Sequence, residues 1–519
     1  MGERSQGGCV GVAVKISGSG LTLEAVEAIA RDGESATLDP KARKAVERSR
    51  GAVEKILTSK QLVYGINTGV GDLKSVRIPA AKLRHLQVNL IRSHAAGVGK
   101  PFPAEVVRAM VAIRLNAFAK GFSGVTPGLV DAMAAMLNAG VHPLVPSKGS
   151  VGSSGDLAPL AHIGLGLIGE GEAEHGGKVV EAAAALKAAG LKPYALREKE
   201  GISILNGTQA MTAVGVLALL DAERALRAAA VAGAMALECL DSSEKPFDPR
   251  VHAARPHPGA RDVANAVARM VKGSGMIKGH EDCDKVQDPY SSRALAQVLG
   301  ASLDALRHAR GILEVEINSA TDNPLVFPDT GEVISGGNFH GQPVALAMDY
   351  LAIAVAEIAD IMERTIARLV AGEEGGLPRF LARDAGLNSG WMIAQYTAAA
   401  LASENKVLAH PASVDSIPTS AGQEDHNSMG TIAARKGRSV VENTSTVVGI
   451  ALVCAAEGMD LHKGRPGKGS AAGRAAVRRS VKPLLVDRPI YRDLETAAEL
   501  VKSGAVVGAV EKVVGPLGF

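Results

Sequence analysis

The feature that most constrains the fold of this chain is a nearly uninterrupted apolar stretch at residues 208–239. A stretch that is hydrophobic all round predicts a helix buried in a core. Residues 344–371 predict a second long helix, because their charged side chains recur at helical spacing on an otherwise apolar surface. Residues 393–408 and 440–458 continue this pattern, and residues 494–502 close it. These patterns therefore predict a set of long helices in the part of the chain that follows residue 200.

Composition also favours a helical fold. The 519 residues are 46% hydrophobic but only 3% aromatic. A sheet sandwich would want more aromatic and β-branched residues than this chain has. We predict a mainly α protein with long antiparallel helices in a central bundle. A short tail at 1–10 and a mixed N-terminal part at 11–200, which carries the loop described below, precede the helical bundle and C-terminal helical region at 201–519.

Net charge, the N-terminal pattern and the cysteines limit the cellular locations and the classes of partner expected for this protein. The formal net charge of +3 is too balanced to indicate a nucleic-acid or anionic-membrane partner. The N-terminus lacks a charged-then-apolar signal pattern, and apolar stretches such as 228–240 are too short to span a bilayer. The cysteines lie far apart without CxxC spacing, which predicts reduced thiols in a cytoplasmic protein. They are Cys9, Cys239, Cys283 and Cys454.

The N-terminal part mixes helices with irregular segments. Amphipathic patterns predict helices at 25–31, 41–58, 104–120 and 127–139, and residues 178–180 are predicted to pair in a small ribbon.

Residues 142–156 are predicted to form a loop, because they hold Pro143, Pro146 and three glycines. Asp156 is expected to cap a helix that follows at 157–169.

One pentapeptide of this loop, residues 152–156, can turn backbone into an electrophile. If the amide nitrogen of Gly155 attacks the carbonyl carbon of Ser153, a five-membered ring closes. Loss of water from the ring and from the Ser154 side chain leaves an exocyclic methylidene, which is an electron sink. Glycine suits the attacking position because it lacks Cβ, and the side chain of Ser153 stays outside the ring. Standing alone, such a Gly/Ser-rich segment is more often a turn or a flexible loop.

Other blocks of the chain favour the chemistry. In order and spacing they resemble the ammonia-lyase family that builds a methylidene-imidazolone cofactor from its own backbone, and within it the histidine-specific lyases. The blocks run from Tyr64-Gly65-Ile66-Asn67-Thr68-Gly69 through 86–97, 205–209, 247–252, 286–293, 335–341 and 410–416 to Gln423-Glu424-Asp425-His426-Asn427-Ser428-Met429.

The resemblance implies a cofactor and an assembly. Ser153, Ser154 and Gly155 would form 4-methylidene-imidazol-5-one autocatalytically, with no external cofactor. The protein would be a homotetramer whose active sites combine segments of more than one subunit. The reaction would eliminate ammonia from an amino acid across Cα–Cβ, where the β-hydrogen is not acidic and ammonium leaves poorly.

The resemblance also assigns roles. Tyr64 would be the base, in a tyrosine loop that two glycines allow to close over substrate. Without the block around it, Tyr64 would be a half-buried tyrosine with a satisfied hydroxyl. Arg293 would bind the substrate carboxylate bidentately, although alone it would be a surface arginine. Asn206 would bond the same carboxylate or the cofactor carbonyl. Further polar donors and a pocket wall would come from Gln287, Tyr290 and Phe339, the last of which is equally compatible with a core aromatic role.

Two positions favour histidine as the small-molecule substrate. Ser93-His94 falls where the family has its selectivity pair, and a lyase for phenylalanine or tyrosine would be expected to show leucine at the second position. The Glu424 carboxylate can pair with an imidazole ring. A pocket containing His94 and Glu424 would be costly around a phenyl ring, because buried polar groups would lose partners.

Alternatives stay open at this point. Within the family they are a phenylalanine or tyrosine ammonia-lyase and a 2,3-aminomutase; outside it they are a non-catalytic helical scaffold and a metal-dependent hydrolase. No metal site is expected, because neither Glu424-Asp425-His426 nor His280-Glu281-Asp282-Cys283-Asp284 has the spacing that places ligands on one helix face.

Some positions depart from the family pattern. Ser153 stands where alanine is usual, and Val70 where phenylalanine is common. Ala294-Leu295-Ala296 lacks a frequent Cys-Xaa-Pro, and Asn427 replaces a frequent valine. These departures lie beside the expected site residues and bear on substrate identity more than on reaction class.

Overall fold

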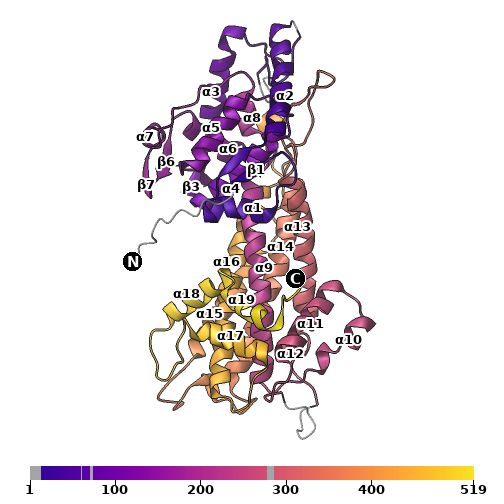
Figure 1. Cartoon of the computed structure of the whole chain (residues 1–519), viewed down its shortest axis with the longest axis vertical. Coiled ribbons are helices and arrows are strands. Elements are labelled where there is room, and N and C mark those ends of the chain that lie inside the picture. Colours follow the sequence, from indigo (N-terminus) through magenta and orange to yellow (C-terminus); the bar gives the residue numbers. More distant parts are fainter. Residues whose placement is uncertain (1–12, 60, 70–73, 278–285) are drawn as a thin grey trace. The chain divides into compact units, whose positions relative to one another are not determined.

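A computed structural model describes residues 13–59, 61–69, 74–277 and 286–519, which form two compact units (Figure 1). The first unit comprises Met1–Leu217, Gly311–Met348 and Pro411–Arg435, and the second comprises Ala218–Arg310, Asp349–His410 and Lys436–Phe519. The predicted division near residue 200 remains a prediction.

The first unit combines helices with short strands. Its helices are α1 (Leu23–Glu27), a π-helical turn η1 (Ala28–Asp32), α2 (Pro40–Thr58), η3 (Ala80–Lys82), α3 (Leu83–His94), α4 (Ala104–Ala119), α5 (Pro127–Asn138), α6 (Leu157–Leu167), α7 (Ala182–Ala188) and α8 (Glu200–Leu205). Its strands are β1 (Val14–Ile16), β2 (Ala36–Leu38), β3 (Val98–Pro101), β4 (His142–Pro143), β5 (Pro146–Lys148), β6 (Glu172–His175), β7 (Lys178–Glu181), β8 (Leu325–Phe327) and β9 (Glu332–Ile334).

The strands form small separate sheets. β1 pairs with β2 in parallel, β3 with β5 and β8 with β9 antiparallel, and β4, β6 and β7 make a three-stranded sheet in that order. The predicted ribbon at 178–180 is therefore confirmed as part of β7. The predicted loop at 142–156 is interrupted by β4 and β5, because prolines can occupy short edge strands.

Long helices dominate the remainder. They include α9 (Gln209–Cys239), α13 (Leu295–Glu316), α14 (Gln342–Ala371), α15 (Met392–Leu408) and α16 (Gly430–Leu461). Shorter helices of the second unit are η4 (Lys245–Phe247), α10 (Pro249–Ala254), α11 (Pro258–Val271), α12 (Tyr290–Arg293), η6 (Arg379–Leu381), α17 (Lys468–Arg478), α18 (Tyr491–Lys502) and α19 (Ala505–Val514); η7 (Ser420–Gly422) belongs to the first unit. The prediction of a mainly α protein is confirmed.

Contacts inside the second unit give the helix directions. Glu223 of α9 pairs with Arg310 of α13, and Gly233 lies against Leu295, so these two helices run antiparallel. α13 also runs antiparallel to α14, since Ser302 donates to Ala354 O and His308 packs on Tyr350. α14 and α16 run in the same direction, because Asp349 pairs with Lys436 and Thr444 donates to Val355 O.

Small side chains bring these helices close together. A Cβ on Gly233 would lie 2.4 Å from Leu295 Cδ2, well inside van der Waals contact.

Cys239 and Cys454 are buried free thiols, and burial raises the pKa of both. The prediction of reduced thiols is confirmed for these two; Cys9 and Cys283 lie outside the described residues.

Helix α16 is longer than the predicted 440–458. Among the described residues it is the one helix whose length and hydropathy would allow a membrane span, but 78% of its most apolar window is buried within the protein. Core helices pass the same test, so this helix is weak evidence for a membrane span. Helices α11 and α13 were not predicted from the sequence.

Candidate functional site

The Gly152–Asp156 loop is clamped on one side by the start of α9. The amide of Asp156 donates to Gly207 O at 2.7 Å. Gly155 has a φ of +74°, and a Cβ placed on it would lie 2.2 Å from Gly207 O. Only glycine fits this close approach, because any side chain would meet backbone and the backbone angle is strained for L-residues. Gly155, which would be the attacking residue in the ring closure predicted from the sequence, is thus also the residue that packing requires to be glycine.

Asp156 holds the loop through its buried carboxylate. Oδ2 accepts from the Met211 amide at 2.8 Å, and Oδ1 accepts from Ser150 Oγ at 2.8 Å and from Thr431 Oγ1. Burial raises the pKa of Asp156, while these hydrogen bonds act in the opposite direction. The predicted capping role is wrong in its detail: Asp156 stands at the N-cap position of α6, but its side chain makes no cap hydrogen bond.

The other side of the loop meets the segment that leads into α16. Ser428 Oγ donates to Gly152 O at 3.0 Å, and the Met429 amide donates to Val151 O at 2.9 Å. A Cβ on Gly152, whose φ is +72°, would collide with Ser428 Oγ at 2.2 Å. Segments far apart in sequence therefore fix the backbone around Ser153 and Ser154 from two directions.

Two cavities of the first unit share Tyr64, Ser154, Asn206 and Glu424. One has a volume of about 340 Å³ and is also lined by Ser93, His94, Leu90, Leu157, Ile202, Leu205 and Ser420. The other has a volume of about 460 Å³ and adds Phe339, Asn323, Lys74, Gln423, Ser335 and Gly336. Clefts of this size suit small molecules. The smaller one combines aliphatic side chains with polar groups, and the larger one is lined mostly by polar side chains.

Glu424 contacts both serines of the loop. Ser154 Oγ donates to Glu424 Oε1 at 2.8 Å, and Ser153 Oγ donates to Oε2 at 2.9 Å. Thr419 Oγ1 also donates to Oε2, at 2.7 Å. The sequence singled out Glu424 for the substrate ring, but it gave no sign of these contacts with Ser153 and Thr419.

His94 ends helix α3 at the wall of the smaller cavity. Its Nδ1 lies 2.8 Å from Leu90 O and 3.1 Å from Ser93 Oγ. Since a carbonyl only accepts, Nδ1 carries the proton in this contact, and in the neutral ring Nε2 is then an acceptor. The ring is thus oriented by its own helix.

Asn206 follows helix α8, which is fixed against α3. The Gln87 side chain of α3 accepts from the Gly201 amide at 2.9 Å. The side-chain nitrogen of Asn206, Nδ2, donates to Ile202 O at 3.3 Å and to Asn323 O at 3.4 Å. These bonds fix the side chain with its amide nitrogen directed to the protein backbone.

Buried charge supports the same region. Lys199, which is fully buried, lies 3.5 Å from Asp322 and donates to Ser203 Oγ at 3.0 Å. Burial lowers the pKa of Lys199, and the neighbouring Asp322 opposes that change. Arg114 donates to Gln209 at 3.0 Å, and burial lowers its pKa to about 10. Removing one partner of such a buried pair is strongly destabilising, so this cluster fixes the frame beneath the cavities.

Tyr64 lies on a turn and lines both cavities. The Asn67 side chain accepts from the Val63 amide at 2.8 Å, and Thr68 Oγ1 accepts from the Gly65 amide at 3.2 Å. Lys74, which sequence reasoning did not single out, donates to Gln423 across the larger cavity. Val70, one of the departures from the family pattern, lies outside the described residues.

The remaining expected residues belong to the second unit. Tyr290 and Arg293 lie in helix α12, and Gln287 is exposed just before it. Arg293 donates to Asp288 O at 2.9 Å, and its guanidinium lies 4.6 Å from the centroid of the Tyr290 ring. Tyr290 is 72% exposed. None of the three lines the two cavities described above.

Within the described ranges, no cluster of three or more His, Cys, Asp or Glu side chains could hold a metal ion. Glu424 is engaged with hydroxyl groups instead. The segment 280–284 lies outside those ranges.

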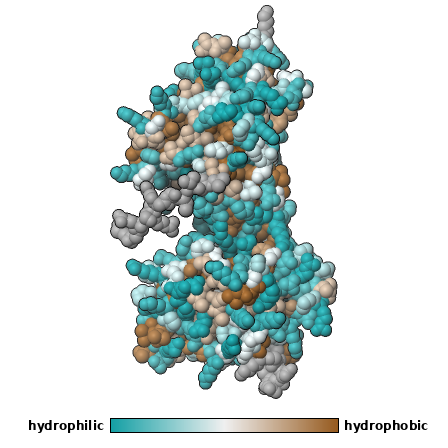
Figure 2. All heavy atoms as spheres, in the orientation of Figure 1, coloured by the Kyte–Doolittle hydropathy of each residue, from teal (hydrophilic) through white to brown (hydrophobic). Residues whose placement is uncertain are grey.

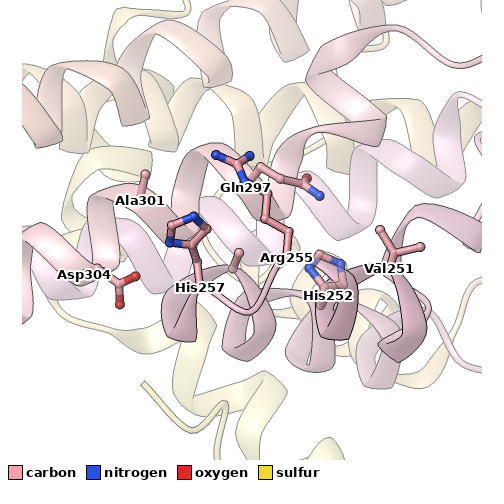
Figure 3. Close-up of a pocket in the computed structure, with 8 residues that line it drawn as sticks. Val251, His252, Arg255, His257, Gln297, Ala301 and Asp304 are labelled. Carbon is pink, nitrogen blue, oxygen red and sulfur yellow. The ribbon is translucent and has the colours of Figure 1, made fainter.

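A third cavity, of about 120 Å³, lies inside the second unit between α10, α11 and α13 (Figure 3). His252, Arg255 and His257 reach it from one side and Gln297 from the other. His252 is engaged with Pro246 O at 3.0 Å, and Asp304 accepts from the Gly259 amide at 3.0 Å. This cavity contains none of the residues predicted to act on a substrate.

Comparisons with known proteins identify the family of this chain. Residues 21–480 match the aromatic amino acid lyase family. A histidine ammonia-lyase of Gloeobacter violaceus is 52% identical, over 97% of this chain and 98% of its own, and one of Anaeromyxobacter dehalogenans is 52% identical, over 95% and 99%. Among solved structures, a histidine ammonia-lyase from Trypanosoma cruzi has a TM-score of 0.90 and 41% identity, covering 96% of this chain and 95% of that one. A tyrosine aminomutase from Streptomyces globisporus has a TM-score of 0.92 and 38% identity, covering 97% and 99%.

Proposed function

This chain belongs to the aromatic amino acid lyase family, and we propose that it releases ammonia from L-histidine to give trans-urocanate, the first step of histidine degradation. The relatives named histidine ammonia-lyase, about 50% identical over nearly the whole chain, support this substrate. The observation that carries it is one cavity in which Ser154 lies with His94 and Glu424.

The residues of the loop fit the self-made cofactor. Gly155 has the positive φ and the absence of Cβ that the crowded site requires, and Ser154 lines both cavities. Ser153, Ser154 and Gly155 would form 4-methylidene-imidazol-5-one with loss of two waters, and no external cofactor is needed. The ring would supply an electrophilic methylidene that takes the substrate amine and improves it as a leaving group.

The side chains around the loop have separate tasks in this proposal. Tyr64, which lines both cavities, removes the β-proton. Glu424 and His94 hold the imidazole ring by complementary polar contacts. Asn206 donates its side-chain amide N–H to the substrate carboxylate or the cofactor carbonyl, in exchange for its contacts of 3.3 and 3.4 Å with Ile202 O and Asn323 O. Phe339 closes the larger cavity as an apolar wall.

Arg293 is the clamp for the substrate carboxylate in this proposal, with Gln287 and Tyr290 beside it. Because Gln287 and Tyr290 are exposed on their own unit and Arg293 is half-buried beside them, we propose that α12 completes the site of another subunit in a homotetramer. Exposed apolar side chains on α14 and α15 offer association surfaces; they are Tyr350, Ile353, Ile393 and Tyr396. Apolar patches interrupt the hydrophilic surface in the space-filling view (Figure 2). We also propose that the enzyme acts in the cytoplasm, as the widely separated cysteines indicate.

A tyrosine or phenylalanine 2,3-aminomutase is the second candidate, because tyrosine aminomutase and phenylalanine aminomutase structures share this fold at 38% and 33% identity. An aminomutase returns the ammonia to the β-carbon, so its product is a β-amino acid.

The test is incubation with histidine, tyrosine and phenylalanine separately. Ultraviolet absorbance would follow the conjugated product, and chromatography would detect any β-amino acid. We expect urocanate and ammonia in equal amounts from histidine. A preference for tyrosine or phenylalanine, or a β-amino acid as main product, would overturn the histidine assignment.

A further inference from the structure

The two carboxylate oxygens of Glu424 have different partners. Oε1 accepts one hydrogen bond, from Ser154 Oγ at 2.8 Å. Oε2 accepts two, from Ser153 Oγ at 2.9 Å and from Thr419 Oγ1 at 2.7 Å. The carboxylate is thus tied by one oxygen to the group that reacts and by the other to groups that do not.

Ring closure changes only one of these ties. The Gly155 nitrogen bonds to the Ser153 carbonyl carbon and that oxygen leaves as water; the Ser154 hydroxyl leaves as a second water. Oε1 therefore loses its donor. The Ser153 hydroxyl is attached to a carbon outside the ring, and Thr419 is not part of the segment 153–155 that reacts. Both donors to Oε2 therefore remain.

Backbone pairing keeps Thr419 and Glu424 on one face. The Thr419 amide donates to Glu424 O at 2.9 Å, and the Glu424 amide donates to Thr419 O at 3.3 Å. Directly paired residues of antiparallel segments point their side chains to the same side. Ser420 and Ala421, in the turn between them, adopt φ values of +52° and +53°, a strained conformation for residues other than glycine. The turn is thus shaped so that Thr419 reaches the carboxylate.

We propose that Ser153 is a positioning residue for substrate recognition. With Thr419 it anchors Oε2 of Glu424, so that Oε1, released by ring closure, points at the imidazole N–H of the substrate. Ser153 is only 4% exposed, and a hydrogen bond to a carboxylate is strong where water is excluded. This inference rests on the proposed function and deepens it, because it gives the Ser153 side chain a task that ring closure does not require.

The experiment compares Ser153→Ala with Ser153→Thr, which keeps a hydroxyl at the same place. Intact-protein mass reports ring closure, and both variants should be lighter than their encoded masses by two waters. Binding of imidazolepropionate and of phenylpropionate is then measured as competitive inhibition and by calorimetry. These acids lack the amine, so they report ring recognition without turnover.

For Ser153→Ala we expect imidazolepropionate to bind about tenfold more weakly and phenylpropionate to bind as it does to wild type, since one bond to a charged group is lost. The KM for histidine should rise by a similar factor while kcat stays within about twofold, because binding of ground state and transition state weaken together. Ser153→Thr should bind both acids as wild type does, and Thr419→Val should repeat the pattern of Ser153→Ala.

Unchanged imidazolepropionate binding in Ser153→Ala would overturn the inference. So would an equal loss for both acids, which indicates a general structural role, or a mass without the loss of two waters, which indicates a role in ring closure. Failure of the proposed function would be recognised separately, in the wild-type enzyme, as an absence of urocanate from histidine.

Discussion

The expected site residues fall into two groups that differ in where they lie and in which contacts hold them. The cavity group, comprising Tyr64, His94, Ser154, Asn206 and Glu424, is drawn from five separate segments of the first unit and lines one shared space. The exposed group, comprising Gln287, Tyr290 and Arg293, lies in seven consecutive positions of the second unit. The fold brings the cavity group together from separate segments, whereas the exposed group is contiguous in sequence and lies at the surface of its unit.

The difference shows in how each group is held. The cavity group depends on close approach of separate loops, as at Gly155 against Gly207. In the exposed group, Arg293 is held locally, by Asp288 O and the ring of Tyr290. A local arrangement of this kind keeps its shape without a partner, which is what a surface needs if it serves a neighbouring subunit.

The largest expected effect is on the cavity group. Ser154→Ala should lower histidine turnover by about three orders of magnitude or more, because no other side chain supplies the electrophile. Its mass should equal the encoded value, whereas wild type and Ser153→Ala should be lighter by two waters. The melting temperature should stay close to that of wild type. A wild-type mass equal to its encoded mass would contradict the self-made cofactor.

The next prediction tests whether the two groups meet in one active site across subunits. Tyr64→Phe and Arg293→Ala should each lower turnover by roughly a hundredfold, through loss of the base and of a bidentate carboxylate contact. Co-expressed with two different tags and purified as mixed oligomers, the two variants should recover roughly a quarter of wild-type activity, since random mixing in a symmetric assembly leaves that share of sites intact.

Mixed oligomers of Tyr64→Phe with Tyr64→Ala are the control and should recover nothing. If mixed oligomers of the Tyr64 and Arg293 variants also show no recovery, both groups act within one chain, and the exposed group does not serve a neighbouring subunit.

A smaller effect is expected at the oxygen that faces the substrate. Glu424→Gln should lower histidine turnover by about ten- to a hundredfold, because an amide replaces a carboxylate in a charge-assisted hydrogen bond worth roughly 1.5–3 kcal/mol. Ring closure, measured by mass, should continue. Turnover of histidine unchanged from wild type would remove Glu424 from substrate recognition.

Much of the cavity group could be predicted from the sequence, because local blocks identify its members. Tyr64, His94, Asn206 and Glu424 were each named from a short motif, and the structure places them in one cavity with Ser154. The predictions of long helices succeeded for the same reason, since apolar periodicity is a local property.

What the sequence could not supply are contacts between distant segments. Asp156 was expected to cap α6, as its position suggests, yet Met211, Ser150 and Thr431 occupy its carboxylate instead. Thr419 and Lys74 have no motif of their own, so their contacts with Glu424 and Gln423 appear only in three dimensions. Tertiary donors can override a local preference of about 1 kcal/mol for capping.

The smallest expected effect separates two roles of Tyr290. Its ring lies 4.6 Å from the Arg293 guanidinium, and its hydroxyl is a possible donor to substrate. Tyr290→Phe keeps the ring and Tyr290→Leu removes it. An exposed cation–π contact is worth roughly 0.5–1 kcal/mol, so Tyr290→Leu should have a kcat/KM about two- to fivefold below that of Tyr290→Phe. The comparison is made at saturating and at low histidine, because a misplaced carboxylate clamp raises KM before it lowers kcat. If the two variants are equally impaired, the hydroxyl accounts for the whole effect of Tyr290, and the ring contributes nothing to holding Arg293. The conformation of the exposed group would then not be set within its own unit. Contact with the neighbouring subunit would have to order it.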